Sequence, residues 1–399
     1  MRRFVIIGAG LAGHRAATEL RRHDPTAAID LIGDEDALPY DRPPLSKDVL
    51  LGKTAGTTLK DADRYDEQAI TFHRAVTATA IDRAGQTVTL SDGSALPYDA
   101  LLLATGSRPR PLPEAIAGDA PVHYIRTARD AETLRDRLRK GSSLLVVGGG
   151  FIGLEVASAA IQLGCTVTVI EAAERLLARG LPALAASHIQ RLHQNSGVRI
   201  LTGTRLERLR RDGDAVIAET SGGEIRGDVV IAGIGALPNV ELAQSVGLEV
   251  RDGIVVDGLC RTSDPLIFAA GEVTAHPVAL LGGHRRLESW KVAQAQPVVA
   301  AAIMADIACE PYAELPWLWS DQYACNLQMI GAAERATQFR VRGDPDGDSW
   351  SLIGLDAEGL PVSGVAMNAG RDVSVLRRAI TRGTPLPADF LEGAVDYIS

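Results

Sequence analysis

The chain has 399 residues, 46% hydrophobic and 23% charged, with a formal net charge of −9 at pH 7. This balance is that of an ordinary globular protein, and the length predicts two or three domains. The acidic charge argues against nucleic-acid binding, and no apolar run is long enough to span a membrane. Because Met1-Arg2-Arg3 leads at once into a short strand, no signal peptide is predicted and we expect a cytoplasmic protein.

The first motif is an apolar strand at 4–7 that runs into a glycine loop at 8–13 and then a helical pattern at 14–22. Gly8 allows a tight turn, Gly10 lets a pyrophosphate approach the backbone, and Gly13 lets helix and strand pack closely. The helix N-terminus adds partial positive charge, so this first glycine loop predicts dinucleotide binding.

A second strand at 29–32 ends at Gly33, Asp34 and Glu35. An acidic residue about 20 positions after the loop is expected to bind a ribose hydroxyl. Both Asp34 and Glu35 suit that role, and both also suit a solvated turn.

The same pattern recurs later in the chain. A strand at 144–147 leads into a second glycine loop at 148–153, a helix at 154–163 and a strand at 166–170 that ends at Glu171. Each copy is followed by another apolar strand that closes on glycine and proline, at 101–109 and 229–238. Two dinucleotide sites in one chain indicate electron transfer between a flavin and a nicotinamide.

These motifs resemble those of FAD-dependent, NADH-dependent ferredoxin reductases, the family that includes putidaredoxin reductase and the reductase components of aromatic-ring dioxygenases. The wider fold is that of glutathione reductase. Beyond the glycine loops, the resemblance is carried by segments 40–47, 104–110, 150–155, 262–265, 271–272, 288–290 and 316–323.

The resemblance implies an α/β fold with two Rossmann-like dinucleotide-binding domains and a C-terminal α+β domain. A discontinuous FAD domain would comprise 1–112 and 240–314, with the NAD domain at 113–239 between its parts. The C-terminal domain, 315–399, would cover the flavin.

The resemblance also implies the residues of each site. Those expected to hold non-covalent FAD are Gly8, Gly10, Leu11, Ala12, Gly13, Asp34, Lys47, Ala78, Ala104, Thr105, Gly106, Arg126, Gly271, Glu272 and Trp290. Those expected to hold NADH are Gly148, Gly150, Phe151, Ile152, Gly153, Glu155, Glu171 and Gly235. Ala78 and Trp290 would act through the backbone, and the family position favours Asp34 over Glu35.

The resemblance implies a catalytic role for three residues. Lys47 would lie beside the reactive nitrogen of the flavin, where a cation stabilises developing negative charge. Glu155 would pair with Lys47 and help to position the nicotinamide, although the helix dipole alone favours a carboxylate there. Trp319 would lie near the flavin on the side of the iron–sulfur partner.

Two carboxylates bear on cofactor choice. Glu171, at a strand end, favours NADH because a carboxylate binds the ribose hydroxyls and repels a 2′-phosphate; Arg175 leaves NADPH open. Glu272 departs from the family, in which aspartate is usual at this position, so one extra methylene must be accommodated.

The cysteines decide between thiol and flavin chemistry. Cys165, Cys260, Cys309 and Cys325 form no C-x-x-C pair, and no metal site is signalled. NADH oxidases, peroxidases and disulfide reductases of this fold carry a redox cysteine in the N-terminal half, which is absent here. A rubredoxin acceptor, an NADH oxidase and a flavoprotein redox sensor without turnover stay open as alternatives.

The implied partner is a [2Fe–2S] ferredoxin that feeds a haem monooxygenase or a Rieske dioxygenase. Because such ferredoxins are acidic, docking on this acidic chain requires a local basic patch. The candidates are Lys60, Arg64, Arg285, Arg286 and Lys291.

Overall fold

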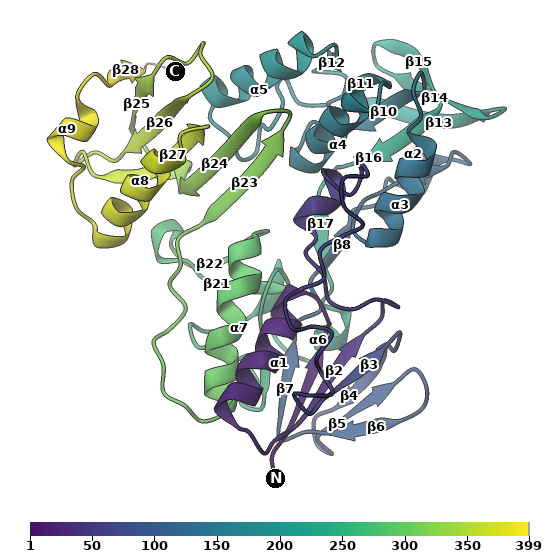
Figure 1. The fold of residues 1–399 in the computed structure, drawn as a ribbon, viewed down its shortest axis with the longest axis vertical. Coiled ribbons are helices and arrows are strands. Elements are labelled where there is room, and N and C mark those ends of the chain that lie inside the picture. The colour runs from purple at the N-terminus through teal and green to yellow at the C-terminus, as the bar shows by residue number, and fades with distance from the viewer. Residues whose placement is uncertain (398–399) are drawn as a thin grey trace. The chain divides into compact units, whose positions relative to one another are not determined.

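The computed structural model describes residues 1–397 and divides into two compact units (Figure 1). The first unit comprises Met1–Asp41, Thr57–Arg108 and Leu237–Pro316. The second comprises Arg42–Gly56, Pro109–Ala236 and the chain from Trp317 onwards. Each unit contains one parallel five-stranded sheet, which confirms the predicted α/β fold with two Rossmann-like halves. The predicted domain boundaries stay a prediction.

The first unit is built on a sheet of order β20-β7-β1-β2-β3. Its strands are β1 (Arg3–Ile7), β2 (Ala28–Gly33), β3 (Ile70–Arg74), β7 (Ala100–Leu103) and β20 (Ile267–Ala269). Residues 4–7 and 100–103 are all buried, because parallel strands covered on both faces need apolar side chains throughout.

Helices α1 (Leu11–His23) and α7 (Trp290–Met304) lie side by side in this unit (Figure 1). The sequence predicted the first helix from residue 14, but it begins at Leu11 with Gly10 as its N-cap, so Gly13 lies in its first turn. Smaller sheets complete the unit: β4 (Ala78–Asp82), β5 (Thr87–Leu90) and β6 (Ala95–Pro97) form one, and β18 (Val250–Arg251), β19 (Gly253–Val255), β21 (Thr274–Pro277) and β22 (His284–Arg286) form the other.

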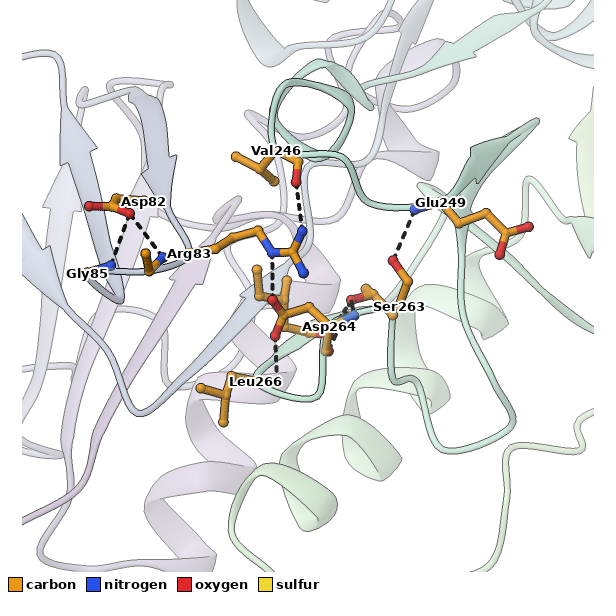
Figure 2. Close-up of polar contacts among 11 residues, drawn as sticks. Asp82, Arg83, Gly85, Val246, Glu249, Ser263, Asp264 and Leu266 are labelled. Carbon is orange, nitrogen blue, oxygen red and sulfur yellow. Dashed lines mark hydrogen bonds and ion pairs between the residues drawn. The ribbon is translucent and has the colours of Figure 1, made fainter.

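An ion pair joins two separate chain segments of this unit (Figure 2). The Arg83 guanidinium donates to Asp264 at 2.7 Å and to the carbonyl of Val246 at 3.0 Å. Asp264 also accepts from the backbone N–H of Leu266 at 2.9 Å, just before β20. The Thr262-Ser263-Asp264-Pro265 segment therefore holds the second half of this unit to the turn after β4.

The second unit repeats the arrangement with a sheet of order β12-β11-β10-β16-β9. Its strands are β9 (Val122–His123), β10 (Ser143–Val147), β11 (Thr166–Ile170), β12 (Arg199–Leu201) and β16 (Val229–Ala232), and its longer helices are α3 (Ala128–Arg137), α4 (Phe151–Gln162) and α5 (Ala183–Asn195). An antiparallel sheet of β13 (Leu206–Asp212), β14 (Ala215–Thr220) and β15 (Gly223–Gly227) adjoins them. As in the first unit, α4 begins earlier than predicted, at the second glycine loop.

The C-terminal part of the second unit is a six-stranded antiparallel sheet of order β23-β24-β27-β26-β25-β28. Its strands are β23 (Trp317–Gln322), β24 (Cys325–Gly331), β25 (Gln338–Gly343), β26 (Trp350–Leu355), β27 (Pro361–Met367) and β28 (Val395–Tyr397). Helix α8 (Gly370–Arg382) packs on β24 and β27 with Val373, Leu376 and Ile380 buried, a three-to-four-residue spacing that places them on one face. This is the predicted α+β C-terminal domain.

No helix within residues 1–397 is long and apolar enough to cross a membrane.

Candidate functional site

The first glycine loop has the three distinct environments that a dinucleotide requires. Gly8 has φ of +110°, and a Cβ atom there would lie 2.2 Å from the carbonyl oxygen of Ala104. A Cβ at Gly13 would lie 1.8 Å from the carbonyl oxygen of Gly8, so no side chain fits. A Cβ at Gly10 would meet nothing within 4 Å. The backbone at Gly10 is therefore open to a ligand, while its neighbours are fixed by packing.

The second glycine loop repeats this division. Gly148 has φ of +102°, and its Cβ would lie 2.6 Å from the carbonyl oxygen of Gly233; a Cβ at Gly153 would lie 2.4 Å from that of Gly148. The nearest atom to a Cβ at Gly150 would be 3.7 Å away. Within this loop, Ile152 lies on the first turn of α4 and is 45% exposed. Both loops therefore fit a bound dinucleotide.

Around the first loop, several predicted residues come together. Thr105 donates to the carbonyl of Asn239 at 2.7 Å, and the Asn239 amide donates back to the carbonyl of Thr105 at 2.8 Å. Those bonds fix the turn at Ala104, Thr105 and Gly106, which packs against Gly8. Gly271 approaches α1, since its Cβ would lie 3.0 Å from that of Ala12.

Glu272 is held by a residue that sequence reasoning missed. Its side-chain carboxylate accepts from the hydroxyl of Ser107 at 2.8 Å, and Ser107 is 4% exposed. Ser107 thus anchors the Glu272 carboxylate. Ser107 lies inside the 104–110 segment that carries the family resemblance. Nothing in that segment distinguishes it from a serine that only serves the turn.

The other first-unit residues predicted to contact FAD lie on different elements. Asp34 is exposed after β2, whereas Glu35 accepts from the Tyr40 hydroxyl at 2.6 Å inside its own loop. Ala78 is buried at the start of β4. Trp290 opens α7, and its indole N–H donates to Asp41 at 3.0 Å.

Lys47 and Arg126, both predicted to contact FAD, lie in the second unit. Lys47 follows the short 3-10 helix η1 (Pro43–Ser46), and its ammonium lies 2.9 Å from the Glu155 carboxylate. The predicted Lys47–Glu155 pair is thus confirmed. The carbonyl of Arg126 accepts a hydrogen bond from Arg42, which joins this segment to the start of η1.

Glu155 is a buried carboxylate with three partners, two at the end of η1 and one on β23. It is 4% exposed and accepts from Ser46, from Lys47 and, at 2.6 Å, from the hydroxyl of Ser320. Burial raises the pKa of Glu155, and the Lys47 charge and the two serine hydroxyls oppose that rise. The sequence motifs contained both serines but gave no sign that they meet.

Glu171 lies at the end of β11, as predicted. One of its oxygens accepts from the backbone N–H of Gly149 and the other from that of Ala173, each at 2.7 Å. Each carboxylate oxygen accepts two hydrogen bonds, so one position per oxygen is left for ribose hydroxyls.

Arg175 is engaged elsewhere. Its guanidinium donates to the carbonyl of Leu181 at 2.9 Å and to that of Ala178 at 3.2 Å. These bonds hold the 176–181 loop together, so Arg175 serves the fold at this position.

Trp319 lies on the edge strand β23, half-buried. Its ring stacks on that of Trp317, with centroids 4.9 Å apart and planes 23° apart. The Arg377 guanidinium lies 5.5 Å from the Trp317 ring centroid. The two indoles form a preorganised aromatic surface.

The predicted basic patch is wrong for Arg286. Its side chain is 9% exposed and pairs with Asp252 at 3.0 Å and Glu288 at 2.9 Å. Arg64 is neutralised by Glu67 at 2.6 Å, and Lys291 pairs with Glu314 at 3.3 Å. Lys60, Arg64 and Arg285 are exposed, and of these three Arg64 is the one paired with a carboxylate through Glu67.

All four cysteines are free thiols: Cys165, Cys260 and Cys325 are buried and Cys309 is exposed. Burial raises the pKa of the Cys165 thiol and of the Cys325 thiol, the latter to about 11, which keeps them protonated and unreactive.

Comparison with known proteins agrees with this geometry. The pyridine nucleotide-disulphide oxidoreductase family matches residues 2–297, and the reductase C-terminal family matches residues 317–396.

Among curated relatives, the ferredoxin–NAD(+) reductase component of the anthranilate 1,2-dioxygenase system of Burkholderia cepacia is 50% identical over 396 residues, covering 98% of this chain and 97% of the relative. The corresponding component of the p-cumate 2,3-dioxygenase system of Pseudomonas putida is 38% identical, covering 94% and 92%.

Among solved structures, the crystal structure of the covalent putidaredoxin reductase–putidaredoxin complex matches with a TM-score of 0.89 at 36% identity, covering 95% of this chain and 93% of that chain. The chain therefore belongs to the pyridine nucleotide-disulphide oxidoreductase family and, within it, to the ferredoxin reductases that carry the reductase C-terminal domain.

Proposed function

We propose that this chain is an NADH-dependent ferredoxin reductase that holds FAD at the first glycine loop and NADH at the second. The observation that carries the proposal is the duplication itself: Gly10 and Gly150 each leave an open backbone at the head of a helix. Bound FAD would accept a hydride from NADH and release its two electrons singly to a one-electron carrier.

The residues of the chain bind, orient and balance charge. The N-termini of α1 and α4 direct backbone N–H groups and partial positive charge at a pyrophosphate. Asp34 and Glu171 would accept from the ribose hydroxyls of FAD and NADH, and Glu272, anchored by Ser107, from the ribityl chain. The remaining residues assigned from the resemblance, Leu11, Ala78, Arg126, Phe151, Ile152, Gly235 and Trp290, would act as further cofactor contacts.

Lys47 and Glu155 form the electrostatic centre of the proposal. The Lys47 ammonium is fixed between Glu155 and the carbonyl of Pro43, at 2.9 and 3.0 Å. A cation held in this way stabilises negative charge that develops beside it, with little reorganisation. Trp319 would present the aromatic surface that faces the iron–sulfur partner.

The acceptor is proposed to be a [2Fe–2S] ferredoxin that feeds a dioxygenase or monooxygenase. The two curated relatives are named as reductase components of dioxygenase systems, and a covalent complex with putidaredoxin exists for the related reductase. A cytoplasmic location, where NADH is available, forms part of the proposal, as does the division into an FAD domain (1–112 and 240–314), an NAD domain (113–239) and a C-terminal domain (315–399).

The test is NADH-dependent reduction of cytochrome c in the presence of a [2Fe–2S] ferredoxin, a rubredoxin or neither. The proposal expects turnover that requires the ferredoxin. Turnover with rubredoxin alone would identify a rubredoxin reductase, and rapid oxygen consumption without a carrier would identify an NADH oxidase. Flavin reduction without any onward transfer would indicate a redox sensor.

A further inference from the structure

A continuous chain of buried polar side chains leads from α5 to Glu155 within the second unit. His193 and Ser320 are 0% exposed, Gln322 is 1% exposed and Glu155 is 4% exposed. His193 Nε2 lies 2.8 Å from Gln322 Oε1, Gln322 Nε2 lies 3.0 Å from Ser320 Oγ, and Ser320 Oγ lies 2.6 Å from Glu155 Oε1. Buried polar groups are costly unless satisfied, so four linked ones are a built feature.

The donors in this chain all point towards the carboxylate. The Gln322 carbonyl oxygen only accepts, so His193 Nε2 carries the proton, and His193 Nδ1 accepts from the Tyr323 hydroxyl at 3.2 Å. Burial lowers the pKa of His193, which agrees with this neutral form. The Gln322 amide then donates to Ser320, and the Ser320 hydroxyl donates to Glu155. Hydrogen bonds aligned in one direction polarise one another and strengthen the last one.

The arrangement follows from strand geometry. Alternate residues of β23 face opposite sides of the sheet, so Ser320 and Gln322 share one face and Trp317 and Trp319 share the other. The face with Ser320 and Gln322 packs on α4, which carries Glu155. One strand therefore supplies both the polar network and the aromatic surface.

Glu155 needs such support because of its surroundings. Burial raises its pKa, and Lys47 is the charged group that opposes this rise. Asp321, the acidic neighbour on β23, is instead held by the amide of Asn326 at 2.6 Å. Tyr323 and His193 are uncharged at neutral pH, since burial raises the pKa of Tyr323 to about 12.

We propose that Ser320, Gln322 and His193 are positioning residues that keep Glu155 ionised and thereby keep the Lys47 ammonium fixed. This proposal depends on the proposed function in one respect only, which is that the fixed Lys47 ammonium would lie at the flavin. The charge state of Glu155 is a property of the chain itself.

The test is an infrared titration of the Glu155 carboxyl group in the purified flavoprotein between about pH 5 and about pH 9. The spectrum of Glu155→Gln is subtracted to isolate this carboxyl group among the others. Ser320→Ala removes the direct donor and is expected to raise the protonation midpoint by about one pH unit. Gln322→Leu is expected to raise it less, and His193→Phe least, because each acts through one more link.

The matched control is Ser351→Ala. Ser351 is 0% exposed, belongs to the same unit and donates to a carboxylate, Asp372, at 2.7 Å. It is expected to lower the melting temperature as Ser320→Ala does, without moving the Glu155 midpoint. Ser320→Thr keeps a hydroxyl and is expected to restore the wild-type midpoint.

The order of effects separates positioning from packing. His193→Phe disturbs a fully buried side chain and is expected to cost as much stability as Ser320→Ala or more, yet to shift the midpoint least. An unchanged midpoint in Ser320→Ala would overturn the proposal. It would also be overturned if the midpoint shifts ranked in the same order as the losses of melting temperature in four variants: Ser320→Ala, Gln322→Leu, His193→Phe and Ser351→Ala. The pH profile of flavin reduction by NADH should move with the infrared midpoint. Absence of NADH oxidation in the wild type would instead defeat the proposed function and leave the titration interpretable.

Discussion

The carboxylate of Glu171 accepts a hydrogen bond from the backbone N–H of Gly149 at 2.7 Å, which ties the end of β11 to the second glycine loop. The acid proposed to select the nicotinamide cofactor is therefore hydrogen-bonded to the loop that would hold its pyrophosphate. A change at Glu171 should alter both cofactor preference and loop order.

We expect Glu171→Arg to lower kcat/KM for NADH by roughly 10–100-fold, because a charge-assisted hydrogen bond to ribose is lost. Relative use of NADPH should rise, since the new guanidinium offers a partner for the 2′-phosphate. Arg175 should contribute little, because its guanidinium is held by the carbonyls of Ala178 and Leu181. Steady-state kinetics with both nucleotides measures this, with the nearby exposed Glu174→Arg as control. An unchanged preference would mean that Glu171 does not face the ribose.

Much of this site was predictable because its signals are local. Gly8, Gly10 and Gly13 perform three tasks within one loop, and their spacing follows from backbone sterics alone. Glu171 was found in the same way, as the acid at the end of the strand after a glycine loop. The pairing of Lys47 with Glu155 came from the family resemblance and is present in the structure.

The missed features depend on contacts between distant segments. Nothing near His193 in the sequence indicates that it meets Gln322, because the contact joins α5 to β23. The sequence predicted Arg286 to be an exposed cation, but in the structure it forms ion pairs with Asp252 and Glu288. The one available signal was the alternation of Ser320 and Gln322 on a strand, which places two polar residues on a single face.

We expect Lys47→Met to destabilise the protein by about 3–5 kcal/mol at neutral pH, because it leaves a buried carboxylate unpaired. The pKa of Glu155 is already raised by burial above the 4.5 of the unfolded chain, and it would rise further without Lys47. The folded variant would then hold a proton that the unfolded chain releases, so stability falls as pH rises from about 4.5 through the folded-state pKa.

Melting temperatures of wild type and Lys47→Met at acidic and alkaline pH check this. The deficit of the variant should be larger at the alkaline pH. Lys53→Met is the control, because Lys53 is 62% exposed and lies 3.6 Å from Asp48. A deficit independent of pH would mean that Glu155 does not titrate in the folded variant.

We expect Ser107→Ala to raise the dissociation constant of FAD roughly 10-fold, because Glu272 loses the donor that orients it towards the ribityl chain. Titration of apoprotein with FAD, followed by flavin fluorescence, measures the constant. Ser91→Ala, at an exposed serine that accepts from the Thr77 backbone, should leave it unchanged. Equal FAD affinities for wild type and Ser107→Ala would mean that Glu272 does not bind the flavin.

We expect Lys60→Gln combined with Arg285→Gln to slow ferredoxin reduction, with a larger loss at low ionic strength where surface charges are least screened. Reduction of the flavin by NADH should be unaffected. Arg64→Gln is the matched control, because Glu67 already neutralises that arginine. Stopped-flow traces separate the two half-reactions. A loss that is the same at all salt concentrations would argue against an electrostatic docking role for this pair.

The most direct test of the central claim is an anaerobic single-turnover experiment on the purified flavoprotein. NADH is added in equimolar amount, and the reduced protein is then mixed with excess oxidised [2Fe–2S] ferredoxin while flavin and iron–sulfur absorbance are followed. The account predicts bleaching of the flavin by NADH, then its full reoxidation with two ferredoxins reduced per flavin. A flavin that NADH bleaches but that ferredoxin does not reoxidise would contradict it.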